Sequence, residues 1–225
     1  YAKEAISMST TEKLQTQLLA IEDLDVKLNQ PLSSYTTFKV GGPTDILIAP
    51  TTISALQQAM SLIDTSEWPL FILGAGSNII VSDKGFRGIV IWMDELNNIQ
   101  VDNSKLTAQT GVTLEELANQ ALAAELTGLE FASGIPGSLG GALYMNAGAY
   151  GGEIKDVIAQ VTCLNYQGKK INLTKEDLNL GYRKSILQDK NLIAVEAEFD
   201  LKSGDYKQIN SKMKELEDKR WAKQP

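Results

Sequence analysis

Two glycine-rich segments contain the residues of this sequence that are best suited to bind a phosphate group. The first is Gly74-Ala75-Gly76-Ser77-Asn78, which lies between two short apolar runs. Glycine permits left-handed backbone conformations and close approach, and successive N–H groups in such a turn form an anion-binding nest. The segment therefore predicts a phosphate cradle, with a tight turn between two strands as the alternative.

The spacing of this first segment differs from the dinucleotide-binding fingerprint of the Rossmann fold. That fingerprint needs a third glycine three residues after Gly76 and a helix after it. Ile79 occupies the position, and residues 79–81 have the composition of a strand. We therefore exclude a Rossmann domain.

Residues 133–152 form a second, longer segment that holds 7 of the 18 glycines of the chain within 20 residues. Ile, Leu, Met and Tyr are interleaved with these glycines, which is not typical of a solvated linker. Ordering a backbone costs about 1–2 kcal/mol per residue, and long loops in compact domains are usually functional. We interpret the segment as a glycine-rich loop that binds a ligand, with dense packing as the alternative.

Composition excludes several kinds of site. The chain has no His and a single Cys, Cys163, which excludes imidazole or thiolate zinc sites, Ser-His-Asp and Cys-His nucleophiles, and an intrachain disulfide. A net charge of −7 disfavours a nucleic-acid partner. No apolar run reaches the roughly 18 residues of a membrane span, and the start of the chain has no signal-peptide pattern. We expect a cytoplasmic protein with no metal, nucleic-acid or membrane partner.

The glycine-rich segments must be positioned by alternating helix and strand patterns. Apolar periodicity and helix start signals predict helices at residues 12–21, 50–63, 113–128 and 205–221. Strands are predicted at residues 25–28, 38–40, 45–49, 70–73, 79–81, 88–93, 106–109, 157–166, 169–173 and 192–201. Neighbouring strand runs and a hairpin around Gly168 indicate an α+β fold, and not a regular doubly wound sheet.

Four blocks of sequence resemble the UDP-N-acetylenolpyruvoylglucosamine reductases, flavoproteins of peptidoglycan precursor synthesis. They are residues 35–43 (YTTFKVGGP), 73–81 (LGAGSNIIV), 133–152, with its GIPGSLGGA and MNAGAYGG cores, and 181–185 (GYRKS). The blocks fall in family order across residues 29–201.

This resemblance implies a two-subdomain FAD-binding fold of the vanillyl-alcohol-oxidase (PCMH) type. We expect an N-terminal helix and leader at residues 1–28, FAD-binding subdomains at 29–85 and 86–202, and the start of a truncated third, substrate-binding domain at 203–225. The family's catalytic serine and glutamate would lie beyond Pro225. The chain as given is therefore expected to turn over little or no substrate.

The same resemblance implies NADPH-dependent, FAD-mediated reduction of UDP-N-acetylglucosamine enolpyruvate, a nucleotide-sugar, to UDP-N-acetylmuramate. FAD would be bound non-covalently, because there is no His and Cys163 lies within a predicted strand. Arg183 would stabilise the negative charge that develops on the substrate, and Tyr150 and Tyr182 would line the substrate side.

The implied cofactor-binding residues come from both glycine-rich segments and from one later strand. They are Gly74, Ala75, Gly76, Ser77, Asn78, Gly134, Ile135, Pro136, Gly137, Ser138, Gly140, Gly141, Asn146, Gly148 and Val195. Two other hypotheses stay open at this point. One is a flavin oxidase or dehydrogenase of the same fold that acts on an alcohol or lactone, and the other is a non-catalytic FAD-binding module.

Overall fold

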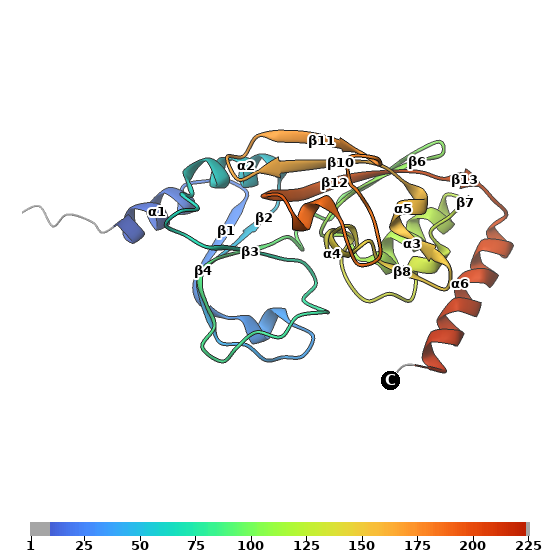
Figure 1. The fold of residues 1–225 in the computed structure, drawn as a ribbon, viewed down its shortest axis with the longest axis horizontal. Helices are drawn as coiled ribbons and strands as arrows, with labels where there is room; N and C mark the ends of the chain where they lie inside the picture. Colours follow the sequence, from blue (N-terminus) through green and yellow to red (C-terminus); the bar gives the residue numbers. More distant parts are fainter. Residues whose placement is uncertain (1–9, 224–225) are drawn as a thin grey trace, which may run out of the picture.

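A computed structural model describes residues 10–223 and contains two main sheets (Figure 1). The four-stranded first sheet has the order β1-β2-β4-β3, with β1 and β2 antiparallel and the other pairs parallel. The second sheet is antiparallel with the order β11-β10-β12-β6-β5. The strands of the first sheet are β1 (Leu24–Pro31), β2 (Pro43–Pro50), β3 (Leu70–Leu73) and β4 (Phe86–Trp92). Those of the second sheet are β5 (Ile99–Asp102), β6 (Lys105–Gln109), β10 (Ile158–Asn165), β11 (Lys170–Thr174) and β12 (Leu192–Asp200).

Helices and short elements join and cover these sheets. The α-helices are α1 (Thr10–Leu19), α2 (Ile53–Leu62), α3 (Leu114–Ala123), α4 (Leu139–Met145), α5 (Ile154–Val157) and α6 (Tyr206–Trp221). The 3-10 helices are η1 (Leu32–Tyr35), η2 (Glu130–Ala132) and η3 (Ile186–Gln188). The strand pairs β7 (Leu126–Thr127) with β13 (Lys202–Ser203), and β8 (Gly148–Ala149) with β9 (Gly152–Glu153), form two small sheets.

The first sheet is buried on both faces. Ile46 and Ile48 of β2 belong to a core that includes residues of α1, α2 and the second sheet, whereas Leu47 and Ala49 pack on the opposite face. This alternation is the two-residue period of a strand, so a continuous apolar run supplies both cores. The predicted strands at 45–49, 70–73 and 88–93 are confirmed.

The C-terminal helix α6 packs on the second subdomain. Its predicted apolar residues Ile209, Met213 and Leu216 are all buried, and Ile209 and Met213 join the core of this subdomain. The helix contacts η2 and α3 and is capped by Asp205, whose carboxylate accepts the N–H of Gln208 at 3.0 Å. It therefore completes the packing of the subdomain that contains the second glycine-rich segment.

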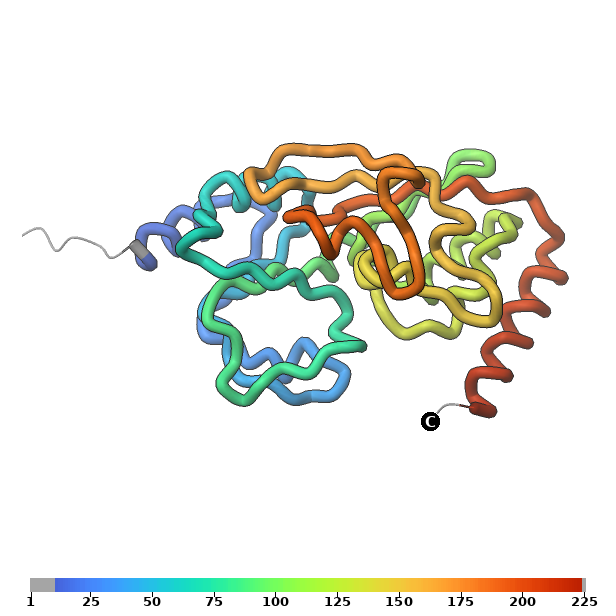
Figure 2. The backbone as a smooth tube through the Cα atoms, in the orientation of Figure 1, coloured from blue at the N-terminus to red at the C-terminus, as the bar shows by residue number. Residues whose placement is uncertain are grey.

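Two predicted strands, at residues 38–40 and 79–81, are wrong. Residues 36–40 form a turn in which Lys39 has φ +53° and donates its N–H to the Thr36 carbonyl at 3.0 Å. Residues 79–81 lie in an irregular loop beside this turn. The two loops are joined by the Gly42 N–H, which donates to the Ser82 carbonyl at 2.9 Å. Figure 2 shows the two loops side by side below the first sheet. Local turn hydrogen bonds and tight glycine contacts replace a strand ladder here.

The second glycine-rich segment is not a loop throughout, because residues 139–145 form helix α4. The Ser138 hydroxyl caps this helix by accepting the N–H of Gly141 at 3.4 Å. Asn146 ends the helix in a left-handed conformation with φ 42°, which asparagine tolerates better than most residues. The predicted helix at 113–128 ends earlier, at Ala123, because Glu125 has φ +56°.

The predicted boundary between the subdomains, at residues 85 and 86, lies just before β4, which is a strand of the first sheet. β4 lies between β2 and β3, so this strand belongs with the first subdomain and not the second. The predicted leader before Thr10 lies outside the described residues. Within residues 10–223, no helix combines the length and the apolar character needed to cross a bilayer.

Candidate functional site

The first glycine-rich segment follows β3 and needs glycine at two positions for steric reasons. A Cβ on Gly76, which has φ +63°, would lie 2.1 Å from the Tyr35 carbonyl oxygen. A Cβ on Gly74 would lie 2.1 Å from the Ser138 hydroxyl oxygen. Glycine therefore lets this segment approach the 35–43 loop on one side and the second glycine-rich segment on the other.

The two glycine-rich segments, about 60 residues apart in the sequence, are in direct contact. The Ser77 hydroxyl donates a hydrogen bond of 3.1 Å to the Pro136 carbonyl. Gly137 has φ +144°, and a Cβ there would lie 3.1 Å from the same Ser77 oxygen. The two segments, which the sequence predicted as separate sites, thus form one continuous glycine-rich surface in the structure.

The backbone donors of residues 74–78 are available to a ligand. Across the described residues, no protein group accepts a hydrogen bond from the N–H groups of this stretch. Unpaired, consecutive N–H groups in a glycine-rich turn are suited to an anion such as a pyrophosphate. These residues therefore fit the phosphate part of a dinucleotide.

In the second segment, several backbone donors are used by the protein itself. Gly140 donates its N–H to Thr110 at 2.8 Å, Gly141 donates to the Ser138 hydroxyl, and Ile135 donates to Ala132 at 3.0 Å. These N–H groups secure α4 and η2, so a ligand could use them only by replacing a protein hydrogen bond. Their residues can still meet a ligand through van der Waals contact.

Val195 offers only its backbone to a ligand. Its side chain is fully buried in the core shared by the two sheets. The residue lies where the pairing of β12 with β10 shifts register, and its carbonyl accepts the N–H of Thr110 at 3.1 Å. A contact through the Val195 side chain is therefore excluded by burial.

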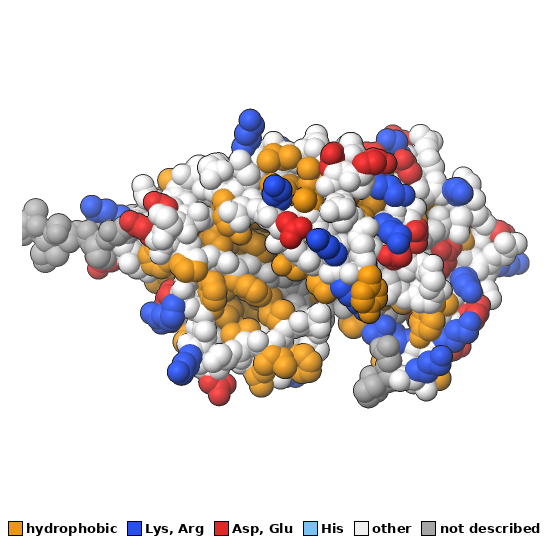
Figure 3. All heavy atoms as spheres, viewed as in Figure 1, with side chains coloured by type: hydrophobic (Ala, Val, Ile, Leu, Met, Phe, Trp, Pro, Cys, Tyr) orange, Lys and Arg blue, Asp and Glu red, His pale blue; other side chains and the backbone are white. Residues whose placement is uncertain are grey.

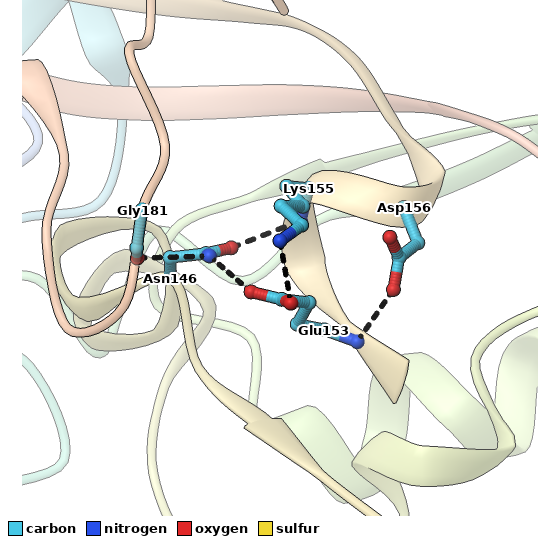
Figure 4. Close-up of polar contacts among 5 residues, drawn as sticks. All are labelled: Asn146, Glu153, Lys155, Asp156 and Gly181. Atoms are coloured by element: carbon cyan, nitrogen blue, oxygen red, sulfur yellow. Dashed lines mark hydrogen bonds and ion pairs between the residues drawn. The ribbon is translucent and has the colours of Figure 1, made fainter. Parts of the chain in front are cut away.

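Asn146, at the end of α4, directs its amide into the protein (Figure 4). It is 4% exposed and its side chain bonds to Glu153, Gly181 and the N–H of Lys155. Gly148 is equally constrained, because a Cβ there would lie 2.6 Å from the Cβ of Glu153. Both residues shape the end of the second segment.

Tyr150 and Tyr182 extend into solvent from two separate turns. Tyr150, with φ +54°, lies at the turn between β8 and β9 and is exposed. Tyr182 is 92% exposed. Both rings therefore have surface that a ligand can contact.

Arg183 lies at the tip of a tight turn in the segment that passes in front of α4 in Figure 1. It has φ +53°, and Gly181 and Lys184 exchange backbone hydrogen bonds of 3.0 and 3.2 Å around it. The guanidinium carbon lies 5.8 Å from the centre of the Tyr182 ring, and the side chain is exposed. A cation in this position is accessible to an anionic ligand.

Two residues for which the sequence predicted no role fix this turn to α4. Ser185, fully buried, donates its hydroxyl to the Tyr144 carbonyl at 2.8 Å. Gln188 donates its amide to the carbonyls of Tyr144 and Arg183 at 2.9 and 3.1 Å. Ser185 ends the 181–185 block and Gln188 follows it, but hydroxyl and amide side chains in loops are too common for the sequence to predict these contacts.

Glu153 and Cys163 are two of the ionisable groups whose pKa values are shifted in the folded protein. The Lys155 ammonium, 2.7 Å away, lowers the pKa of the Glu153 carboxyl, and the hydrogen bond from Asn146 acts in the same direction. Burial raises the pKa of the Cys163 thiol to about 12, so this thiol is unreactive in the folded protein. No cluster of three or more His, Cys, Asp or Glu suited to a metal occurs in residues 10–223.

Comparison with known proteins agrees with this geometry. Residues 44–174 match the family described as FAD binding domain. The chain is 46% identical over 211 residues to the UDP-N-acetylenolpyruvoylglucosamine reductase of Lactococcus lactis subsp. cremoris, covering 94% of this chain and 71% of that protein. This chain belongs to the UDP-N-acetylenolpyruvoylglucosamine reductase family.

Solved structures agree with the family assignment and confirm the predicted fold class. The UDP-N-acetylenolpyruvylglucosamine reductase of Thermus caldophilus has a TM-score of 0.75 and 33% identity, covering 90% of this chain and 70% of that one. The BBE-like 1 protein of Physcomitrella patens has a TM-score of 0.62 at 15% identity, covering 84% and 44%, which shows the shared fold alone. The chain is thus a reductase-family member with the vanillyl-alcohol-oxidase-type FAD-binding fold.

Proposed function

We propose that this chain forms the flavin-binding part of an NADPH-dependent enzyme that reduces UDP-N-acetylglucosamine enolpyruvate to UDP-N-acetylmuramate for peptidoglycan synthesis. The observation that carries the proposal is the contact between the two glycine-rich segments, the second of which also holds the Arg183 turn through α4 and Asn146. Family membership supplies the substrate class, since the Lactococcus and Thermus relatives are named for reduction of this enolpyruvyl nucleotide-sugar. Cytoplasmic location is part of the proposal.

The residues present fit FAD. Residues 74–78 offer unpaired N–H donors for the pyrophosphate, and Pro136 and Gly137 continue this surface from the second segment. When bound, FAD supplies hydride transfer between NADPH and the double bond of the substrate. In Figure 3 the surface is hollowed between the lobe formed by the loops of the first subdomain and the second subdomain, where such a cofactor could lie.

Arg183 is the residue that we assign to the substrate. Hydride addition to the β-carbon of an enolpyruvyl ether leaves negative charge on the α-carbon and its carboxylate. A planar guanidinium that is permanently charged stabilises this enolate through paired hydrogen bonds. Loss of such a donor typically costs about 2.7–4 kcal/mol of transition-state stabilisation. Tyr150 and Tyr182 are proposed to line the same side.

The test is an Arg183→Lys substitution in the protein that carries this chain. We expect an unchanged flavin absorbance spectrum and a rate of enolpyruvyl-substrate reduction lowered at least about 100-fold. Arg87→Lys is the matched control, because Arg87 is an exposed arginine paired with Asp45 in the first subdomain. Unchanged turnover in Arg183→Lys would remove Arg183 from the mechanism and favour another flavin-linked reaction or a binding role.

The expected low turnover of residues 1–225 alone stays a prediction. It is measured by mixing the chain with FAD, NADPH and the enolpyruvyl substrate and following NADPH absorbance. Full turnover by this chain would show that the expectation of missing catalytic residues was mistaken, and would leave the assignment of the reaction intact.

A further inference from the structure

A hydrogen-bond network centred on the buried side chain of Asn146 joins the end of α4 to the turn that carries Arg183 (Figure 4). Its centre is the amide of Asn146. The amide nitrogen donates to the Glu153 carboxylate and, at 3.1 Å, to the Gly181 carbonyl. The amide oxygen accepts the N–H of Lys155 at 3.0 Å. All of these bonds are made within the protein, although sequence resemblance places Asn146 among the cofactor-binding residues.

Glu153 is held by its own partners and in turn fixes the Asn146 amide. Its Oε1 pairs with the Lys155 ammonium at 2.7 Å, while its Oε2 accepts from Asn146. Its backbone N–H donates to the Asp156 carboxylate at 3.0 Å, in a capping box at the start of α5. Because both oxygens of the Glu153 carboxylate only accept hydrogen bonds, the Asn146 amide must turn its nitrogen, the donor atom, toward Glu153.

The Gly181 carbonyl is the point where this network reaches the Arg183 turn. The carbonyl accepts the Lys184 N–H at 3.2 Å across the turn as well as the Asn146 amide. On the other side of the turn, the Gln188 amide binds the Arg183 carbonyl. Arg183 itself has φ +53°, a conformation that an arginine rarely adopts without such support.

We propose that Asn146 and Glu153 are positioning residues that fix the Arg183 turn relative to the flavin site, and that Asn146 is not a flavin ligand. This rests on the proposed function of Arg183. An arginine stabilises a developing charge only if its direction is set before the reaction, because reorienting it during the reaction would offset the gain. The tip of this turn is exposed, so its direction depends on bonds at its base.

The Asn146→Asp substitution distinguishes a residue that positions the Arg183 turn from a residue that binds flavin. Aspartate has the same shape and tolerates the left-handed conformation, but it offers a carboxylate oxygen where the amide donates to Gly181 and Glu153. Asn103→Asp is the matched control. Asn103 is also left-handed, with φ +54°, and its amide also donates to a carboxylate, at 3.0 Å, in the turn between β5 and β6.

The first measurement is trypsin cleavage after Arg183 and Lys184, combined with titration of FAD. For Asn146→Asp we expect cleavage at this turn to accelerate about tenfold, as for the loss of one or two hydrogen bonds. FAD affinity should stay within about twofold, because the donors at residues 74–78 are untouched. FAD affinity lowered by tenfold or more, with unchanged cleavage, would instead make Asn146 a flavin ligand and overturn the proposal.

The second measurement is the rate at which chemically reduced flavin in the protein that carries this chain passes hydride to the enolpyruvyl substrate. Asn146→Asp should slow this step about tenfold in the Arg183 protein and have little effect in an Arg183→Lys background. Equal slowing in both backgrounds would indicate a general structural role and contradict positioning. If the rate of hydride transfer is the same in Arg183→Lys as in the wild type, the proposed function fails. The cleavage measurement then still decides whether Asn146 holds the turn.

Glu153→Gln provides an independent variant if Asn146→Asp does not fold. It keeps the length of the side chain and an oxygen that can accept from Asn146, but removes the ion pair with Lys155. We expect cleavage at the Arg183 turn to accelerate by about threefold, less than for Asn146→Asp. Unchanged cleavage in Glu153→Gln would remove Glu153 from the proposal.

Discussion

The Ser77 hydroxyl donates a hydrogen bond of 3.1 Å to the carbonyl of Pro136 and so joins the two glycine-rich segments. One segment follows a strand of the first sheet, and the other includes helix α4 of the second subdomain. A cofactor that spans both segments therefore depends on a contact between subdomains, and not on either loop alone.

We predict that Ser77→Ala weakens FAD binding by about 2- to 10-fold, as expected for the loss of one neutral hydrogen bond. The measurement is quenching of flavin fluorescence on titration with protein. Ser61→Ala is the control, because the Ser61 hydroxyl also donates to a backbone carbonyl, that of Gln58 at 2.7 Å, on helix α2. Equal affinity in the two variants would mean that the contact does not shape the site.

Gly74→Ala should disrupt the site through a steric clash. The added Cβ would lie 2.1 Å from the Ser138 hydroxyl oxygen, and overpacking of this kind costs about 1–3 kcal/mol. We expect a lower midpoint of thermal unfolding and weak FAD binding. Removing the hydroxyl as well, in Gly74→Ala with Ser138→Ala, leaves a closest contact of 3.2 Å. The double variant should therefore lose less stability than the sum of the single variants, and additive losses would contradict this explanation.

Gly141→Ala distinguishes packing from cofactor contact. A Cβ at this exposed position in α4 has its nearest neighbour at 3.7 Å, an ordinary contact. Alanine favours a helix over glycine by about 0.8–1.0 kcal/mol, so the midpoint of thermal unfolding of the cofactor-free protein should rise. Because sequence resemblance places Gly141 against the flavin, we expect FAD affinity to fall at the same time. Unchanged affinity would remove Gly141 from the cofactor contacts.

Burial of the Cys163 thiol should make the folded protein less stable at alkaline pH. Its thiol pKa is raised from 9.0 to about 12 by burial, so between these values the folded state keeps a proton that the unfolded state has lost. Stability from this group is thus complete below pH 9 and decreases as pH rises toward about 12. Denaturant unfolding of the wild type and Cys163→Ala across this range measures the effect.

We also predict that FAD is not attached covalently to Cys163. Acid precipitation should leave yellow flavin in the supernatant, and a yellow pellet would contradict non-covalent binding.

Sequence reasoning predicted elements best where a periodic pattern was supported by burial on both sides. The alternation of Ile46, Leu47 and Ile48 specifies a strand because each residue enters a different core. Residues 38–40 and 79–81 have strand composition but no ladder, because the glycines around them allow turns that bring the two loops together. A propensity for strand has no effect without a partner strand in the right register.

By itself, the sequence determined the family, through four blocks in family order, and the α+β class, through neighbouring strand runs and a hairpin. It also excluded imidazole chemistry, since there is no His in the chain. Only the tertiary structure decided which of those residues remain free to meet a ligand. The N–H groups at 74–78 are unpaired among the described residues, whereas the Asn146 amide is used up within the fold. The reason is physical: an N–H group can serve a ligand only if its hydrogen is not already donated to a protein neighbour. Neighbours 35 residues apart in the sequence, such as Asn146 and Gly181, are brought together only by packing.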